Sequence, residues 1–435
     1  MSIQLTTPTD RESAISLARS KGEPDWLVQL RGESAELAGT LPWPKPEKMR
    51  IERWNLTAVG NYEAQVKAES VSELPAIAGE LIAKGTENLV VQRNSGVVWS
   101  GLSADLAAKG VIFTDLETAC REHGELVQQY LFQAVKKDED KLTALHAALW
   151  NGGIFLYVPK NVDVEVPLQA VLFNDNQEAT FAPHILIVAE SNSRVTYVDT
   201  VVTDKSAVAA EFTHPSIVEV FVKGGAQVRF GTIHALGETG ADLSVRRAVV
   251  ENDGRIEWII GDLNDGNTMS ETKSVLNGQG STSDTKVISV GQKSQNMSLT
   301  TAAQHFGKSS DSNMVTRAVM KDSASAIING VTKIEHGATK ANGVQAEKVL
   351  MLSPKARGDA NPILLIDEDD VTAGHAASVG QVNPEQVYYL MARGITKQDA
   401  ERLIIYGFLA PVVSEIPVEA VREQLQRLLE RKLQG

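Results

Sequence analysis

The chain has 435 residues, of which 43% are hydrophobic and 22% charged, a composition typical of soluble globular proteins. Its length exceeds one ordinary compact core, so several domains or an elongated repeating architecture are expected. A formal charge of −13 argues against nucleic-acid binding, no apolar run is long enough for a membrane span, and the single cysteine excludes an internal disulfide.

Residues 1–150 are expected to form a mostly helical N-terminal domain. The first residues carry no secretion or import pattern and the chain is nearly free of cysteine, so we expect a cytoplasmic protein. Residues 115–135 and 140–150 space apolar residues three and four apart, as amphipathic helices do. A proline-rich stretch at 41–55 predicts an extended strap. Cys120 falls in the first predicted helix, where we expect a buried small hydrophobic residue.

Residues 151–375 predict a parallel β-helix core. Short runs rich in Val, Ile and Thr alternate there with Gly, Asn, Asp and Ser, as strands separated by turns. From Gly254 to Gly380 the only aromatic residues are Trp258 and Phe306. Sandwiches and barrels usually contain several large rings in the core, whereas stacked coils can be filled with aliphatic and small side chains. The expected fold class is therefore mainly β.

Residues 376–435 predict a C-terminal helical domain of three short helices. Gly394 marks the end of the first helix, and Leu425, Leu428 and Leu429 lie on one face of the last. The predicted starts are Asn383 as an N-cap, Thr396 as an N-cap and Pro417 in the first turn. Two interpretations stay open: the helices cover the last coil of the β-helix, or they dock a partner protein.

Two of the eight histidines stand among small residues, where we expect turns after strands: His336 and His375. The eight histidines never have the spacing of a zinc motif, so most of them are interpreted as structural, and no internal zinc site is expected. In "VTAGHAASVG", His375 is accessible, and a neutral imidazole there could serve as a metal ligand or a proton carrier. A structural role for His375 is an equal alternative. The acidic run Asp367–Asp370 predicts a solvated turn.

Enzyme signatures are missing from the sequence. There is no G-x-S-x-G elbow, and the β region lacks the aromatic platforms expected of a carbohydrate-active β-helix. "AAQHFGKSS", from Ala302 to Ser310, ends like a phosphate-binding loop but lacks its first glycine and the helix that must follow. These absences argue against a hydrolase, and a stand-alone carbohydrate-active β-helix protein is kept as an alternative.

The segment from Val371 to Val413, with "YLMARGI" and "DAERLIIYGF", closely resembles the C-terminal signature of the SufB/SufD family of iron-sulfur cluster assembly proteins. "EPDWLVQLR" and the 41–55 stretch are similar to the N-terminal part of the SufD branch. The resemblance implies a right-handed parallel β-helix flanked by helical regions. SufD is favoured over SufB because Gly374 and Ala376 flank His375 where SufB has glutamates, and the β region has no cysteine.

This resemblance also implies a function. The chain would be a non-catalytic subunit that pairs with SufB and anchors the ATPase SufC, through which ATP acts. His375 matches the histidine proposed to act at the SufB interface, where a nascent iron-sulfur cluster is held transiently. Ala373 stands where some SufD proteins have a cysteine, so the soft ligands must come from SufB. A principal scaffold of SufB type is an alternative, and a homodimer in isolation and flavin binding stay open.

The SufC-docking surface is expected on the first two C-terminal helices, as an amphipathic segment in a groove of the partner. Some of its apolar side chains must instead pack within the chain itself. The expected contacts are Tyr388, Arg393, Ile404, Tyr406 and Phe408.

Overall fold

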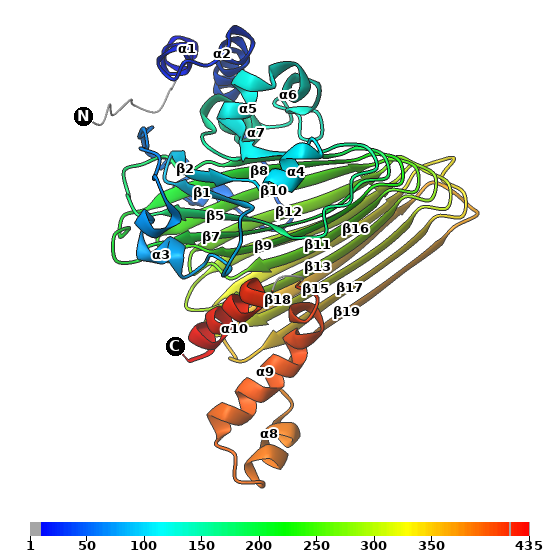
Figure 1. Cartoon of the computed structure of the whole chain (residues 1–435). Helices are drawn as coiled ribbons and strands as arrows, with labels where there is room; N and C mark the ends of the chain where they lie inside the picture. Colours follow the sequence, from blue (N-terminus) through cyan, green and yellow to red (C-terminus); the bar gives the residue numbers. More distant parts are fainter. Residues whose placement is uncertain (1–9, 417–418, 435) are drawn as a thin grey trace.

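A parallel β-solenoid dominates the computed structural model, which describes residues 10–416 and 419–434 (Figure 1). From β4 onward, consecutive strands alternate between two sheets, one of 10 strands and one of 9 strands. Each of these strands pairs in parallel with the strand two positions along the chain, as β13 and β15 do in a ten-residue register. The mainly β class and the stacked coils predicted from the sequence are thus confirmed.

Strands of both sheets are ten residues long over most of the solenoid. In spatial order, the 10-stranded sheet consists of β19 (Thr372–Gln381), β17 (Asn342–Met351), β15 (Asp311–Met320), β13 (Thr282–Gly291), β11 (Arg255–Asp262), β9 (Gln227–Ala235), β7 (Arg194–Thr203), β5 (Leu168–Asn174), β1 (Leu89–Arg93) and β2 (Gly96–Gly101). The 9-stranded sheet consists of β18 (Arg357–Ile366), β16 (Ser325–Ile334), β14 (Asn296–His305), β12 (Asn267–Leu276), β10 (Gly240–Val250), β8 (Phe212–Val222), β6 (His184–Ala189), β4 (Ile154–Val158) and β3 (Ile112–Asp115).

The interior between the two sheets changes character along the solenoid. In the first coils, Tyr197, Phe230 and Trp258 stack across neighbouring strands, with ring centroids 5.2 and 5.0 Å apart. Beyond Trp258 the buried apolar residues are smaller, such as Met297 and Ala326. Side chains in register lie directly above one another. Where one coil has small interior residues, the two sheets lie closer together, and the next coil must also have small interior residues. This stacking explains the scarcity of aromatic residues in the second half of the chain.

The N-terminal region is less separate from the solenoid than predicted. Strand β1 pairs in parallel with β5, so this region supplies strands to both sheets as well as helices. The predicted helix at 115–135 is interrupted at His123, and its last residues are irregular; Cys120 is buried, as expected. The helices are α1 (Arg11–Ser20), α2 (Asp25–Thr40), α3 (Ala76–Gly79), α4 (Ala104–Ala108), α5 (Leu116–Glu122), α6 (Gly124–Tyr130) and α7 (Lys141–Leu149), with 3-10 turns at Ile51–Arg53 and Val71–Glu73.

Three C-terminal helices follow the last strand: α8 (Pro384–Met391), α9 (Lys397–Val413) and α10 (Glu419–Gln434). The side chains of Asn383 and Thr396 cap α8 and α9, as predicted, while Pro417 lies outside the described residues. Because β19 runs to Gln381, the solenoid extends six residues past the predicted boundary at 375. Within the described segments, the helices are too short or too polar to cross a lipid bilayer.

Helices α9 and α10 pack along the side of the solenoid. Their buried apolar residues contact the outer face of the 10-stranded sheet, and a cap over the last coil is therefore the wrong interpretation for these helices. The contacting residues are Ile405, Leu409, Leu425 and Leu429 on the helices and Ile233, Ile259, Ile288 and Val319 on the strands. The last coil is left exposed at the far edge of the molecule (Figure 1).

Candidate functional site

The last coil of the solenoid ends in two unpaired strand edges. Among residues 10–416 and 419–434, strand β18 pairs only with β16 and β19 only with β17, so each forms the edge of its sheet. Apolar side chains are exposed on both strands: 47% of Leu365 and 42% of Val379 is accessible. Long, flat and apolar edges normally pair with another chain. We call these two strands the terminal coil.

Strand β19 is better suited to such pairing than β18. Strand β18 contains Arg357, Asp359 and Pro362, residue types that protect an edge, whereas β19 reads TAGHAASVGQ, without a charged residue or a proline. The amide of Thr372 donates to the carbonyl of Ala341, within the sheet. Backbone groups alternate in direction along a strand, so the amides of the odd-numbered residues of β19 face outward. These are Ala373, His375, Ala377, Val379 and Gln381.

His375 lies in the middle of β19, so the prediction that it occupies a turn is wrong. Its register partner is Gln345 on β17, and that side chain is fully buried in the interior. Register partners in a parallel sheet share a face, which places His375 on the inner face of the terminal coil. In the part of the chain that the structure describes, no coil lies beyond His375, so the residue is exposed, and an added Cβ at neighbouring Gly374 would meet no described atom within 4 Å. We call the open end of the solenoid interior at the terminal coil the mouth. The mouth therefore contains an accessible imidazole.

A carboxyl group lies on the same inner face, one coil deeper. Glu347 is two residues beyond Gln345 on β17, and only 1% of its surface is accessible. Burial raises the pKa of Glu347 to about 7. Within the described chain, its Oε2 atom has no hydrogen-bond partner. The mouth thus combines an imidazole with a carboxyl group that can exchange a proton near neutral pH.

Glu347→Gln should make the thermal stability less dependent on pH. Because the folded chain holds the Glu347 proton more tightly than the unfolded chain, the wild type is stabilised below the unfolded pKa of about 4.5. That stabilisation is lost as pH rises toward the folded pKa of about 7. Melting temperatures measured between these pH values should fall for the wild type and fall less for Glu347→Gln. Equal slopes would contradict the raised pKa.

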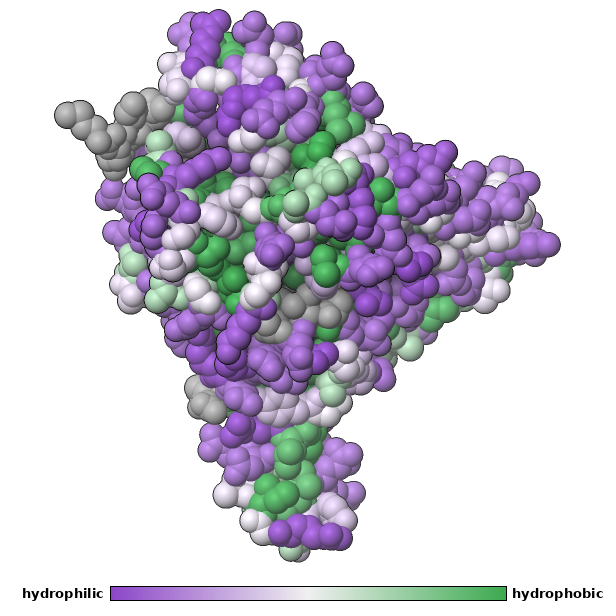
Figure 2. Space-filling model, in the orientation of Figure 1, coloured by the Kyte–Doolittle hydropathy of each residue, from purple (hydrophilic) through white to green (hydrophobic). Residues whose placement is uncertain are grey.

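The first C-terminal helices project from the solenoid as a hairpin with an apolar surface. We call α8 and the first half of α9 the projecting hairpin. Tyr388 is 73% exposed, Tyr389 57% and Leu403 50%, and Met391 is also exposed. Figure 2 shows a hydrophobic stripe on this part of the molecule, bordered by hydrophilic residues. Exposed apolar patches with a polar rim are typical of protein interaction sites.

The five residues predicted to contact a partner divide between two environments. Tyr388 and Arg393 are exposed on the hairpin, where Arg393 lies over the Tyr389 ring at 4.9 Å from its centroid. Ile404 is half-buried. Tyr406 and Phe408 are half-buried against the core cluster formed by α9, α10 and the outer face of the sheet. Tyr388, Arg393 and Ile404 are therefore the three positions accessible to a partner.

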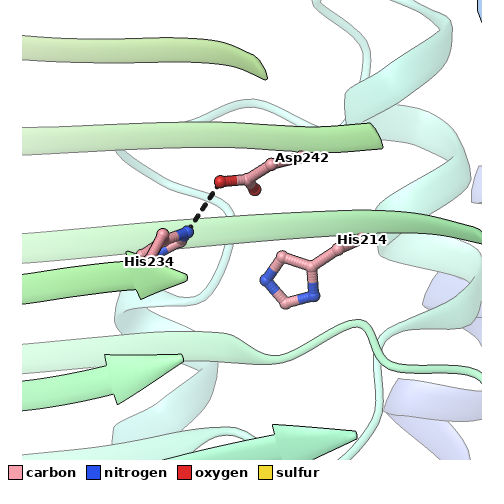
Figure 3. A group of neighbouring side chains, drawn as sticks. All are labelled: His214, His234 and Asp242. Carbon is pink, nitrogen blue, oxygen red and sulfur yellow. Dashed lines mark hydrogen bonds and ion pairs between the residues drawn. The ribbon is translucent and has the colours of Figure 1, made fainter. Parts of the chain in front are cut away.

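Sequence reasoning found neither Glu347 nor a second polar group inside the solenoid. His214, His234 and Asp242 come from β8, β9 and β10 and meet inside the solenoid (Figure 3). Their spacing matches no motif, and the histidines of the chain were mostly interpreted as structural. The sequence nevertheless contains a signal. Side chains along a strand alternate between the inner and outer face, and each of the three residues is at an inward-facing position of its strand. Inward-facing neighbours on the same strands are Phe212, Phe230 and Ala248. The group lies many coils from His375 and belongs to a different part of the molecule.

Comparison with known proteins gives consistent matches over most of the chain. A family model described as the SufBD core domain of the SUF system for FeS cluster assembly matches residues 171–408, and one described as the SufBD protein N-terminal region matches residues 86–170. The chain is 48% identical to the iron-sulfur cluster assembly protein SufD of Bacillus subtilis, with 100% of both chains covered. It is 28% identical to SufBD family proteins of Staphylococcus saprophyticus and Staphylococcus haemolyticus, over 96% of this chain and 92% of each relative.

Proposed function

The chain belongs to the SufB/SufD family of iron-sulfur cluster assembly proteins, and from this premise we propose that it is a non-catalytic scaffold subunit of a cluster assembly complex. It pairs with SufB through the terminal coil and anchors the ATPase SufC on the projecting hairpin. The observation that carries the proposal is the uncapped β19 edge, with His375 on the inner face of an open mouth.

The ligand chemistry supports a shared site rather than a site within this chain. Iron-sulfur clusters are held mainly by cysteine thiolates. Cys120 is the one cysteine of the chain, it is buried in α5, and burial raises its pKa, which disfavours the thiolate. The thiolates must therefore come from the partner. His375 supplies a nitrogen ligand or transfers a proton, and a nascent cluster is held between the two subunits.

Both partner surfaces lie close together in the sequence. Strand β19 ends at Gln381 and α8 begins at Pro384, so the proposed SufB edge and the proposed SufC surface are joined by two residues. A movement of the hairpin caused by ATP-driven changes in SufC would act directly on the end of β19. This short connection supports a role in which ATP hydrolysis by SufC alters the pairing of the terminal coil.

His375→Ala should reduce cluster assembly by the complete complex at least about 10-fold, because even groups that merely support a metal ligand contribute that much to metal affinity. The measurement is the rate of cluster formation under anaerobic conditions, followed by visible absorption. His336→Ala is the matched control, since His336 is an exposed histidine in a turn before β17. Unchanged assembly by His375→Ala would show that the imidazole is not used.

Anaerobic reconstitution of the isolated chain separates this proposal from the alternative of a SufB-type principal scaffold. The chain alone should form no stable cluster when given iron and sulfide, because its one thiol is buried. The same chain in complex with SufB and SufC should form one. A cluster retained by the isolated chain through gel filtration would favour the principal-scaffold alternative.

A further inference from the structure

Three buried side chains converge where β9 ends and β10 begins. His214 and Asp242 are register partners on the neighbouring strands β8 and β10, and His234 comes from β9 in the facing sheet. One potential ligand atom from each residue lies within 4.8 Å of the other two. In Figure 3 the His214 ring lies beside the hydrogen-bonded His234 and Asp242. The group therefore joins the two sheets across the interior.

His214 has an unused nitrogen inside this group. Its Nδ1 atom lies 2.8 Å from the carbonyl oxygen of Phe181, which can only accept, so Nδ1 carries the proton and donates. Nε2 then has a free lone pair, and no described residue donates a hydrogen bond to it. Burial lowers the pKa of His214 to about 4, which keeps the imidazole neutral. A histidine whose other nitrogen donates to a backbone carbonyl is in the arrangement usual for metal ligands.

The carboxylate of the group is held in place from several sides. His234 Nδ1 lies 2.8 Å from Asp242 Oδ2, and Asn264 donates to the same oxygen over 2.7 Å. Ser244 donates to the other oxygen over 2.7 Å. Burial alone would raise the pKa of Asp242, but the neighbouring His234 lowers it well below its ordinary value, so the group is ionised. An oriented carboxylate beside two imidazoles is a common donor set for zinc and iron.

The ionisable side chains around the group have a net negative charge when they are ionised. Asp199, Asp242 and Asp262 are buried carboxyl groups in this part of the interior, and among the described residues the guanidinium of Arg246 faces all three. Fully ionised, three carboxylates and one guanidinium leave two negative charges. Burial raises the pKa of Asp199 and of Asp262, because uncompensated charge is costly inside the solenoid. A divalent ion would balance these charges.

We propose that His214, His234 and Asp242 form an internal site for one divalent transition-metal ion, which fastens the two sheets of the solenoid to each other. Metal bonds of about 2.1 Å place tetrahedral ligand atoms about 3.4 Å apart. His234 Nδ1 and Asp242 Oδ2, now 2.8 Å apart, therefore have to separate slightly, and the His214 nitrogen, within 4.8 Å of both, has to approach by at most about 1.4 Å. The ion takes the place of the proton between His234 Nδ1 and Asp242. That proton moves to Nε2 of the same ring, and Arg246 turns from Nε2 toward Asp262, 3.7 Å away.

The site is separate from the terminal coil in position and in role. It is a permanent structural ion deep in the first coils, whereas the cluster proposed above is transient and lies at the open mouth. Loss of the internal ion should lower the melting temperature of the isolated chain. A negative result for His375 would leave this proposal unaffected, and the reverse also holds.

Refolding of the full chain with Co²⁺ tests the site, because a fully buried site is loaded most easily during folding. We expect about one Co²⁺ per chain after gel filtration in the presence of a chelator, visible absorption bands of a low-symmetry Co²⁺ site, and a higher melting temperature than after refolding without metal. Wild-type chain that refolds but retains no cobalt would overturn the proposal.

Variants assign the ion to the three side chains. His214→Gln and Asp242→Asn should each lower the retained cobalt at least about 10-fold. His305→Gln is the matched control: His305 is a buried solenoid histidine that contacts Ser310 and Ser312, and this variant should bind like the wild type. Full retention by His214→Gln would refute the assignment. If the variants do not fold, anomalous diffraction from cobalt-loaded wild-type crystals decides, since a peak anywhere other than between the three residues contradicts the site.

Discussion

Ala377→Pro is expected to abolish pairing with SufB while the solenoid itself stays folded. The alternation along β19 turns the amide of Ala377 away from β17, so its loss should remove no hydrogen bond of the described sheet. A partner strand, however, loses a donor and meets the proline ring. The partner carbonyl left without a donor costs about 1–3 kcal/mol, which corresponds to a complex weaker by roughly 5- to 150-fold, and the steric clash of the ring adds to this. Co-purification of SufB with the tagged chain measures the effect.

Ala377→Ser is the control for this substitution, because it changes the side chain and keeps the amide. It should pair like the wild type. Ser378→Pro provides the opposite comparison: the amide of Ser378 faces β17, so this variant should destabilise the last coil itself. Normal pairing by a correctly folded Ala377→Pro variant would exclude the β19 edge as the interface.

Combined replacement of Tyr388 and Leu403 by alanine should remove the ATPase from the complex. Both side chains are at least half exposed on the projecting hairpin, so their removal leaves the solenoid core intact. A buried tyrosine at the centre of an interface contributes about 2 kcal/mol or more, so the double substitution should weaken SufC binding at least about 30-fold. Titration calorimetry with purified SufC gives the affinity.

Phe306→Ala is the matched control for the hairpin, since Phe306 is 45% exposed but lies in a turn after β14. It should bind SufC with unchanged affinity. Tyr406→Ala and Phe408→Ala differ from the hairpin variant. We expect each of them to lower the melting temperature of the chain, because these residues pack on the core cluster. Wild-type affinity in the hairpin double variant would place the ATPase elsewhere on the chain.

The coils of the solenoid could be predicted from the sequence because their signal is local. Runs of β-branched residues, turn residues between them and the lack of aromatic rings after Trp258 each follow from stacking thin coils. The helix caps at Asn383 and Thr396 were predictable for the same reason, since each cap depends on a hydrogen bond only two or three residues away.

Features that depend on distant pairing could not be predicted in this way. The small residues around His375 are equally compatible with a turn and with an edge strand, and only the register with β17 decides between them. His214 and Asp242 are 28 residues apart and become neighbours because one coil of the solenoid separates them. The joining of β1 to β5 likewise depends on a contact across the domain boundary.

Hydrogen exchange at the backbone amides of β19 tests the central claim most directly. In the isolated chain, diluted until light scattering shows a monomer, the outward-facing amides of Ala373, His375, Ala377 and Val379 should exchange rapidly. In the complex with SufB they should become protected, while the amides of β2 at the opposite edge keep their rates. Unchanged exchange along β19 in a complex that assembles clusters would contradict the account.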